Sequence, residues 1–166
     1  MQVPIRKPGK YTHAKTDPHL TPGKFDALKK QLDLLLRIDR PPAIREVKRL
    51  AEMGDFSENA AYQIAKGRLR WINERILTIE DRVKKAVIIK PNSNDSRVQL
   101  GSQVTVSIGG QGKIYTILGS TETDPGQGVI SHNSPLGKAL MGKRAGDIFS
   151  VLLGGKEVKI EILKAT

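Results

Sequence analysis

Residues 65–86 read AKGRLRWINERILTIEDRVKKA, and the spacing of their apolar side chains decides the fold of this chain. The apolar positions recur at alternating steps of four and three residues over three heptads, which is the pattern of a coiled-coil helix. A stripe of this kind must be buried against a second helix. Its members are Ala65, Leu69, Ile72, Ile76, Ile79, Val83 and Ala86.

A second stripe of the same kind lies upstream and predicts the partner helix. Thr21 and Pro22 mark its start, because threonine is a favoured N-cap residue and proline suits the first helical position. Pro41 and Pro42 predict a kink or a division of this helix, since each lacks the amide hydrogen of a helical backbone. The stripe comprises Phe25, Leu28, Leu32, Leu35, Ala43, Val47 and Leu50, with Asp39 in the position between Leu35 and Ala43.

A short polar turn, GDFSEN at residues 54–59, separates the two stripes. Two amphipathic helices joined by a short turn pack as an antiparallel hairpin, which we place at residues 21–90. About thirty helical residues at roughly 1.5 Å each give an arm of about 45 Å. The turn is therefore expected at the far end of a long coiled-coil arm.

Beyond the hairpin the apolar period changes from helical to alternating. Residues 91–97 have the composition of a linker, and residues 98–166 predict a small α+β domain of strands around one short helix. Residues 1–20 are basic and rich in proline, and we interpret them as a flexible arm, with a contact to nucleic acid as the alternative. The predicted class is thus α+β, a helical hairpin followed by a small domain. Strands are expected near 104–108, 114–118, 128–131, 147–153 and 156–163, and the helix at 136–141.

The composition favours an intracellular protein with a polyanionic partner. The absence of cysteine excludes disulfide scaffolds, thiolate zinc sites and thiol catalysis. No apolar run reaches the roughly 18 residues of a membrane span, and the first residues lack the apolar stretch of a signal peptide, so we expect a cytoplasmic protein without membrane contact. Lys and Arg number 28 against 17 Asp and Glu, and residues 1–90 carry +9 of the net +11. This bias indicates either nucleic-acid binding or a solubilising surface.

The turn carries two carboxylates, Asp55 and Glu58, whose spacing allows two interpretations. As a structural feature, they are the N-cap and a first-turn acid of the second helix. As a functional feature, two fixed acids repel each other by roughly 4 kcal/mol at 4 Å and an effective dielectric near 20, and a hard divalent cation relieves that repulsion. Because Mg²⁺ takes about six oxygen ligands, the pair would complete a site that another macromolecule half provides.

The sequence resembles the bacterial Gre transcript-cleavage factors over about residues 21–164. In the hairpin, the resemblance rests on Arg40-Pro41, on GDFSENAAY at 54–62 and on ERI at 74–76. In the second domain it rests on LGS at 100–102, YTILG at 115–119 and ISHNSPLGKALMGKRAGD at 130–147. The GDxSENxxY and ISxxSPxGxALxGKxxGD patterns are specific to this family.

The resemblance implies a transcription elongation factor whose hairpin enters the secondary channel of RNA polymerase. The tip would help to hold the second catalytic Mg²⁺, so that the polymerase cleaves its own backtracked RNA. The chain itself would then be neither an enzyme nor a stable metal binder. The family's two acids fall on Asp55 and Glu58. Ser57 and Asn59 would orient the turn or only cap its backbone, and Tyr62 would face the substrate or pack.

The basic residues that follow the tip are Lys66, Arg68 and Arg70. Such a run is typical of a solvated helix face, but the resemblance implies contact with the 3′ segment of the nascent RNA. In charge it is closer to the GreB type than to the acidic GreA type. A third tip acid that many members carry is replaced here by Ala61, which leaves the pair itself intact.

The second domain resembles the family's FKBP-like domain, which binds the polymerase. Ser134, Pro135 and Leu136 are either part of that contact or simply a helix start. An isomerase or chaperone function is the alternative that such a fold suggests, but Tyr115 and Phe149 are too few aromatic residues for the pocket it needs. Another alternative is a regulator or inhibitor that occupies the polymerase channel, or grips structured RNA, without causing cleavage. We expect a monomer with a hinge near residue 91.

Overall fold

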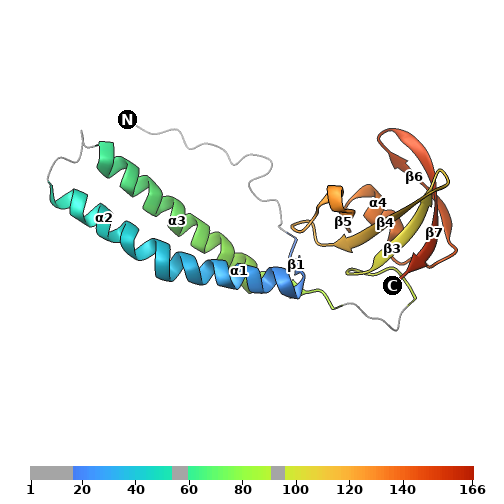
Figure 1. Cartoon of the computed structure of the whole chain (residues 1–166), viewed down its shortest axis with the longest axis horizontal. Helices are drawn as coiled ribbons and strands as arrows, with labels where there is room; N and C mark the ends of the chain where they lie inside the picture. The colour runs from blue at the N-terminus through green and yellow to red at the C-terminus, as the bar shows by residue number, and fades with distance from the viewer. Residues whose placement is uncertain (1–16, 54–59, 91–95) are drawn as a thin grey trace, which may run out of the picture.

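The computed structural model describes residues 17–53, 60–90 and 96–166, which form a helical hairpin followed by a β-rich domain (Figure 1). The first arm of the hairpin consists of α1 (Pro22–Leu34), the π-helical turn η1 (Leu35–Asp39) and α2 (Arg40–Glu52). The second arm is α3 (Ala60–Lys85), which runs back along the first. The predicted α+β class, a hairpin and then a small domain, is confirmed.

Helix α1 begins as the sequence predicts. The Thr21 side chain accepts a hydrogen bond from the backbone N–H of Lys24 at 3.2 Å, and Pro22 follows as the first helical residue. This cap satisfies one of the amide groups that have no partner within the first turn of a helix.

The two prolines are accommodated without a break between α1 and α2. At η1 the backbone N–H of Arg40 bonds to the carbonyl of Leu35, five residues earlier instead of four. Proline removes one helical hydrogen bond and crowds the carbonyl four residues before it. The wider π-helical turn relieves that crowding and places Pro41 and Pro42 at the start of α2.

The two predicted stripes form the core of the hairpin. Ile72 and Ile79 of α3 are almost fully buried, with 2% and 1% of their surface exposed. Side chains at helical spacing on both arms meet in one cluster, which is how a two-helix coiled coil removes apolar surface from water. The buried members of the cluster are Leu20, Leu28, Leu35, Ala43, Ile72, Ile76 and Ile79, and Leu50 and Ala65 are also buried.

The base of the hairpin is closed by a short parallel strand pair. Strand β1 (His19–Leu20) pairs with β2 (Val87–Ile88), which directly follows α3. Leu20 is buried in the hairpin core. Residues 17–20, which the sequence assigned to the flexible arm, therefore belong to the base of the hairpin. The rest of that arm lies outside the described residues.

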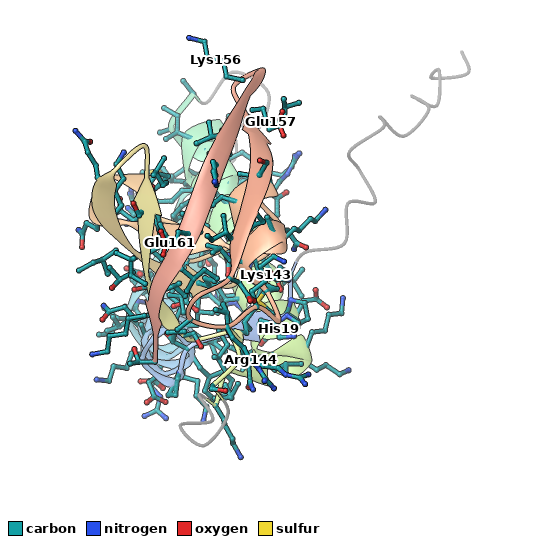
Figure 2. All side chains as sticks on the ribbon, turned by 90° about the vertical axis from the view of Figure 1, so that its right-hand side faces the viewer. His19, Lys143, Arg144, Lys156, Glu157 and Glu161 are labelled. Carbon is teal, nitrogen blue, oxygen red and sulfur yellow. The ribbon has the colours of Figure 1, made fainter. Side chains whose placement is uncertain are left out.

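The C-terminal domain is built on a five-stranded sheet in the order β5-β4-β3-β7-β6. The β3–β4 and β6–β7 connections each contain two glycines with positive φ, the conformation that tight two-residue hairpin turns require. Figure 2 shows Lys156 and Glu157 at the outer end of the β6–β7 ribbon. The bounds are β3 Gln103–Ile108, β4 Gln111–Leu118, β5 Val129–Ser131, β6 Ile148–Leu153 and β7 Lys156–Ala165, with a 3₁₀ turn η2 at Pro125–Gln127.

The core of this domain lies between the sheet and the short helix α4 (Pro135–Leu140). Leu140 of α4 and the inward side chains of three strands have no exposed surface at all. The strand members are Val104, Val106, Ile117, Ile160 and Ile162. Among the described helices, none has both the length and the apolar character needed to cross a membrane.

The two units meet through the segment that leads into α1. The carboxylate of Glu122, in the C-terminal domain, accepts hydrogen bonds from the backbone N–H of Thr21 at 2.7 Å and from its hydroxyl at 2.6 Å. The carboxylate of Asp17 accepts one from the backbone N–H of Ser120 at 2.7 Å. Gly119 lies so close to the His19 carbonyl oxygen that a Cβ atom there would be 2.2 Å from it. These residues define the junction between hairpin and domain.

Candidate functional site

In the sequence, the acidic tip lies between the end of α2 and the start of α3. Asp55, Ser57, Glu58 and Asn59 lie outside the described residues. The helix ends that flank them, Glu52 of α2 and Ala60 of α3, lie at the end of the hairpin away from the C-terminal domain (Figure 1). The roles predicted for the four tip residues stay predictions.

The basic run lies on the first turns of α3, where its members divide between two flanks. Lys66 lies over the ring of Tyr62, with its Nζ atom 5.9 Å from the ring centroid. Arg70 is one turn further along the same flank and forms an exposed ion pair with Glu74 at 3.2 Å. Exposed pairs of this kind contribute little to stability, so Arg70 can exchange its partner for a phosphate at small cost.

Arg68 lies on the other flank of α3, because two residues along a helix turn the side chain through about 200°. It lines a groove between the two arms, together with Pro42, Ala43 and Glu46 of α2. The structure thus brings Tyr62 and Lys66 together and separates them from Arg68. The three basic side chains form two basic edges, one on each side of the half-buried Leu69.

Sequence reasoning gave no role to Trp71, the only tryptophan of the chain. Its side chain is 61% exposed, and it lines a second groove with Leu34 and Arg68. An exposed tryptophan on a coiled coil is unusual, because burial of its large ring is favourable. Its position next to the heptad stripe could have shown that it points outward.

Gly67, for which the sequence gives no explanation, has open space around it. A Cβ atom added there would meet no atom within 4 Å. We expect Gly67→Ala to stabilise the hairpin by about 0.5–1 kcal/mol, because alanine loses less backbone entropy in a helix. Urea unfolding followed by Trp71 fluorescence measures this change. An unchanged or lower stability would contradict the expectation.

Ser134, Pro135 and Leu136 form the start of α4. The Ser134 hydroxyl accepts a hydrogen bond from the Gly137 N–H at 3.0 Å and donates one to the Ser131 carbonyl at 2.7 Å. Leu136 is buried in the domain core. The helix-start interpretation therefore accounts for these residues, and the Leu136 side chain is not available to a partner because the core encloses it. Pro135 is exposed.

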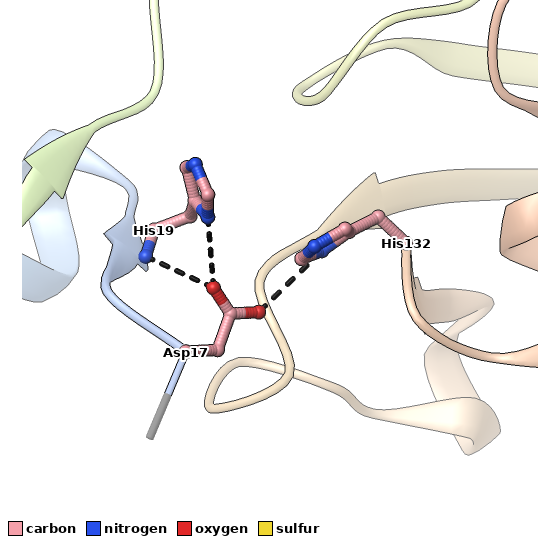
Figure 3. Close-up of side chains that lie close together, drawn as sticks. All are labelled: Asp17, His19 and His132. Carbon is pink, nitrogen blue, oxygen red and sulfur yellow. Dashed lines mark hydrogen bonds and ion pairs between the residues drawn. The ribbon is translucent and has the colours of Figure 1, made fainter. Parts of the chain in front are cut away.

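A polar cluster that the sequence analysis did not find lies at the junction. Figure 3 shows the Asp17 carboxylate between two imidazole rings, those of His19 and His132. His19 Nδ1 is 2.8 Å from one carboxylate oxygen, and His132 Nδ1 is 3.4 Å from the other. The two rings meet edge to face with centroids 5.4 Å apart. No spacing in the sequence signals this cluster, since His132 is more than a hundred residues from the other two.

The carboxylate of Asp17 is held in its charged form. Burial acts to raise its pKa, but hydrogen bonds from the Ser120 N–H and from the His19 side chain and N–H act against it. The balance lowers the pKa of Asp17 from 3.8 to about 2. Only 6% of the side chain is exposed, so solvent screens these bonds weakly.

This lowered pKa gives a pH-dependent stability. A carboxylate with a depressed folded-state pKa stabilises the fold above its unfolded pKa, and the contribution disappears as the pH falls through the folded value. We expect Asp17→Asn to lower the free energy of unfolding by about 2 kcal/mol at pH 7 and by much less near pH 2. Unfolding of both proteins in EDTA at the two pH values measures this, with the exposed Asp26→Asn as control. An equal loss at both pH values would contradict it.

Comparison with known proteins finds matches to both structural units of the chain. A family model described as "Transcription elongation factor, N-terminal" matches residues 19–88, and one described as "Transcription elongation factor, GreA/GreB, C-term" matches residues 92–166. Transcription elongation factor GreA of Macrococcus caseolyticus is 37% identical over 148 residues, which are 87% of this chain and 94% of the relative. GreA of Thermomicrobium roseum is 39% identical over 129 residues, 76% of this chain and 83% of the relative. Among solved structures, the GreA factor homologue Gfh1 of Thermus thermophilus is 26% identical, with 90% of this chain and 99% of that chain covered at a TM-score of 0.41.

The two family models together cover most of the chain and both of its structural units. The chain belongs to the GreA/GreB family of transcription elongation factors. The resemblance inferred from the motifs is thereby confirmed. The relatives from Macrococcus caseolyticus and Thermomicrobium roseum are GreA factors, and the closer likeness of this chain to GreB in charge stays a prediction.

Proposed function

We propose that this chain binds RNA polymerase, inserts its hairpin into the secondary channel and stimulates the polymerase to cleave backtracked RNA. The observation that supports this most is the hairpin. Its two arms share a buried stripe that extends to Leu50 on α2 and Ala65 on α3, close to the helix ends that flank the tip. A rod packed along its length can carry the tip sequence GDFSEN into a narrow channel without unfolding.

The side chains at the tip fit a role in metal-assisted hydrolysis. Asp55 and Glu58 offer carboxylate oxygens, the ligands that Mg²⁺ prefers. In two-metal hydrolysis such an ion activates the attacking water or stabilises the leaving oxygen. Two carboxylates provide too few ligands to hold the ion alone, so the polymerase must supply the others. The chain therefore acts as a coactivator of the polymerase's own nuclease, with Mg²⁺ shared between the two proteins.

The flanks of α3 next to the tip fit a role in holding the RNA. Lys66, Arg68 and Arg70 are exposed within the first three turns of this helix. Positive charges on the turns of α3 that follow the tip in the sequence can contact the phosphates of the displaced 3′ segment, with no preference for base sequence. Tyr62 offers a ring on the same flank as Lys66.

The function is tested with a defined backtracked elongation complex whose RNA is labelled. We expect the chain to accelerate release of a 3′ fragment in the presence of polymerase and to leave the same RNA intact when polymerase is absent. If the chain bound the polymerase and slowed elongation without causing cleavage, the alternative function of a channel inhibitor would be supported instead. Cleavage of free RNA would show an enzyme in its own right, and either result would overturn the proposal.

The contribution of the basic flanks is tested by Lys66, Arg68 and Arg70, all replaced with alanine. Because each lost phosphate contact reduces the salt dependence of binding, we expect weaker binding to the backtracked complex and a shallower slope of log affinity against log salt, by about 0.7 per contact for single strands. Binding of the chain to the backtracked complex, measured at several salt concentrations, gives this slope. Lys30→Ala with Lys84→Ala, two exposed residues near the hairpin base, is the matched control. An unchanged slope would contradict the role of these residues.

A further inference from the structure

The junction cluster places three metal-binding groups around one point. One ligand atom from each of Asp17, His19 and His132 lies within 4.8 Å of the other two. Ligands on a tetrahedral Zn²⁺ ion with bonds of about 2.0–2.1 Å lie roughly 3.3 Å apart. The separation of 3.4 Å between Asp17 Oδ2 and His132 Nδ1 already matches this value. Small side-chain rotations would bring the remaining atoms into range.

The carboxylate in the cluster is fixed by groups that are not themselves ligands. One oxygen of Asp17 accepts the His19 backbone N–H at 3.1 Å, and the other accepts the Ser120 N–H at 2.7 Å. Metal ligands are commonly oriented by hydrogen bonds of this outer kind. The two backbone bonds would keep the carboxylate in place while the imidazole nitrogens exchange a hydrogen bond for a bond to the ion.

The surroundings suit a bound transition-metal ion with an open position. The side chains of Asp17, His132 and His19 are 6%, 19% and 38% exposed, so the cluster is sheltered but reaches solvent on the His19 side. Both histidines of the described part of the chain are in this cluster. Two imidazoles and one carboxylate with a free position form the donor set of many Zn²⁺ sites, whereas Mg²⁺ prefers oxygen ligands alone.

We propose that Asp17, His19 and His132 form a binding site for a divalent transition-metal ion, with Zn²⁺ as the best match. The site joins two units of the fold. Asp17 and His19 belong to the segment that closes the base of the hairpin, and His132 follows β5 of the C-terminal domain. An ion bound there fixes the junction and so limits the movement of the hairpin relative to the domain. The site is separate from the tip acids, and its ligand chemistry differs from theirs.

The site is tested by titrating Zn²⁺ into the full-length chain after removal of metals with a chelator, at pH 7.5 in a calorimeter. We expect one ion per chain, with affinity at least about tenfold weaker in His19→Ala and in His132→Ala, since loss of even an outer-shell partner costs 10–100-fold. His13→Ala, which changes the third histidine of the chain, is the matched control and should bind as the wild type does. A hundredfold excess of Mg²⁺ should not displace the ion.

Two further measurements separate a lost ligand from a damaged fold. His132→Cys supplies a thiolate, another good zinc ligand, and should keep Zn²⁺ binding that His132→Ala loses. In the wild type, Zn²⁺ should slow hydrogen exchange in residues 17–20 and 118–133. The proposal would be overturned if the wild type did not bind zinc, if His19→Ala and His132→Ala bound zinc as tightly as the wild type, or if His13→Ala lost as much affinity as they do. None of these results depends on cleavage activity, so the site and the proposed function can fail separately.

Discussion

Alanine in place of Asp55 or Glu58 is expected to lower the rate of stimulated RNA cleavage by at least about a hundredfold, the usual cost of losing one charge-stabilising group at a reacting centre. Affinity for the polymerase should stay within about twofold. The tip acids are proposed to act on the Mg²⁺ of the reaction, whereas the length of the hairpin and the C-terminal domain are proposed to provide the surface that binds the polymerase. The variants should therefore lose cleavage rate without losing affinity for the polymerase.

The measurement is single-turnover cleavage of a backtracked complex at saturating factor, with binding determined independently. Asp26→Ala and Glu80→Ala are matched controls, because they remove exposed acids elsewhere on the hairpin. Both controls should cleave at the wild-type rate. Wild-type cleavage by the Asp55 and Glu58 variants would show that the tip acids only cap the second helix, which is the structural interpretation of their spacing.

Gly137→Ala is expected to destabilise the C-terminal domain by about 3 kcal/mol or more, at the upper end of single substitutions. Gly137 lies in α4 where the helix packs against the end of β5. A Cβ atom there would be 2.0 Å from the carbonyl oxygen of Ser131 and 2.9 Å from its carbon. Both atoms are backbone, so the clash cannot be relieved by a side-chain rotation and α4 must move away from the core.

The loss is measured by urea unfolding, with hydrogen exchange used to assign it to residues 98–166. Gly112→Ala is the matched control, because a Cβ atom in that position meets nothing within 4 Å and its φ is not positive. We expect the control to change stability by less than about 0.5 kcal/mol. Similar unfolding midpoints for the two variants would show that α4 can shift without cost.

The heptad stripes made the hairpin predictable, because apolar residues with a period of 3.5 over three heptads form a helix whose stripe must be buried against another helix. Ile72, Ile76 and Ile79 are buried as that period requires. The strands of the C-terminal domain followed from alternation and from paired glycines at tight turns. In both regions the local pattern and the packing agree, and short-range rules were sufficient.

Features that depend on distant residues were not predictable. The parallel pair of β1 and β2 is only two residues long on each side and joins segments almost seventy residues apart. The Asp17, His19 and His132 cluster needs the whole fold to bring its members together. The π-helical turn before Pro41 is a local response to strain, and a proline pair predicts a disturbance without defining its form.

The candidate site was predictable to different extents in its two parts. The tip acids were identified by a motif and stay predictions, since residues 54–59 lie outside the described structure. The basic run was predictable as exposed residues beside the stripe, because helical geometry places Arg68 on one flank of Leu69 and both Lys66 and Arg70 on the other. The exposure of Trp71 was not predicted, because a heptad pattern identifies the buried stripe and assigns no environment to the residues between its members.

The most direct test of delivery of the tip acids to a shared ion is the dependence of cleavage rate on Mg²⁺ concentration in a backtracked complex. Wild-type factor should lower the Mg²⁺ concentration that gives half-maximal cleavage, because Asp55 and Glu58 add ligands to an ion that the polymerase holds weakly. The double variant Asp55→Ala, Glu58→Ala should not lower this Mg²⁺ concentration, although it should still bind the polymerase. The same half-maximal Mg²⁺ concentration for the wild type and the double variant would contradict delivery of the tip acids to the shared ion.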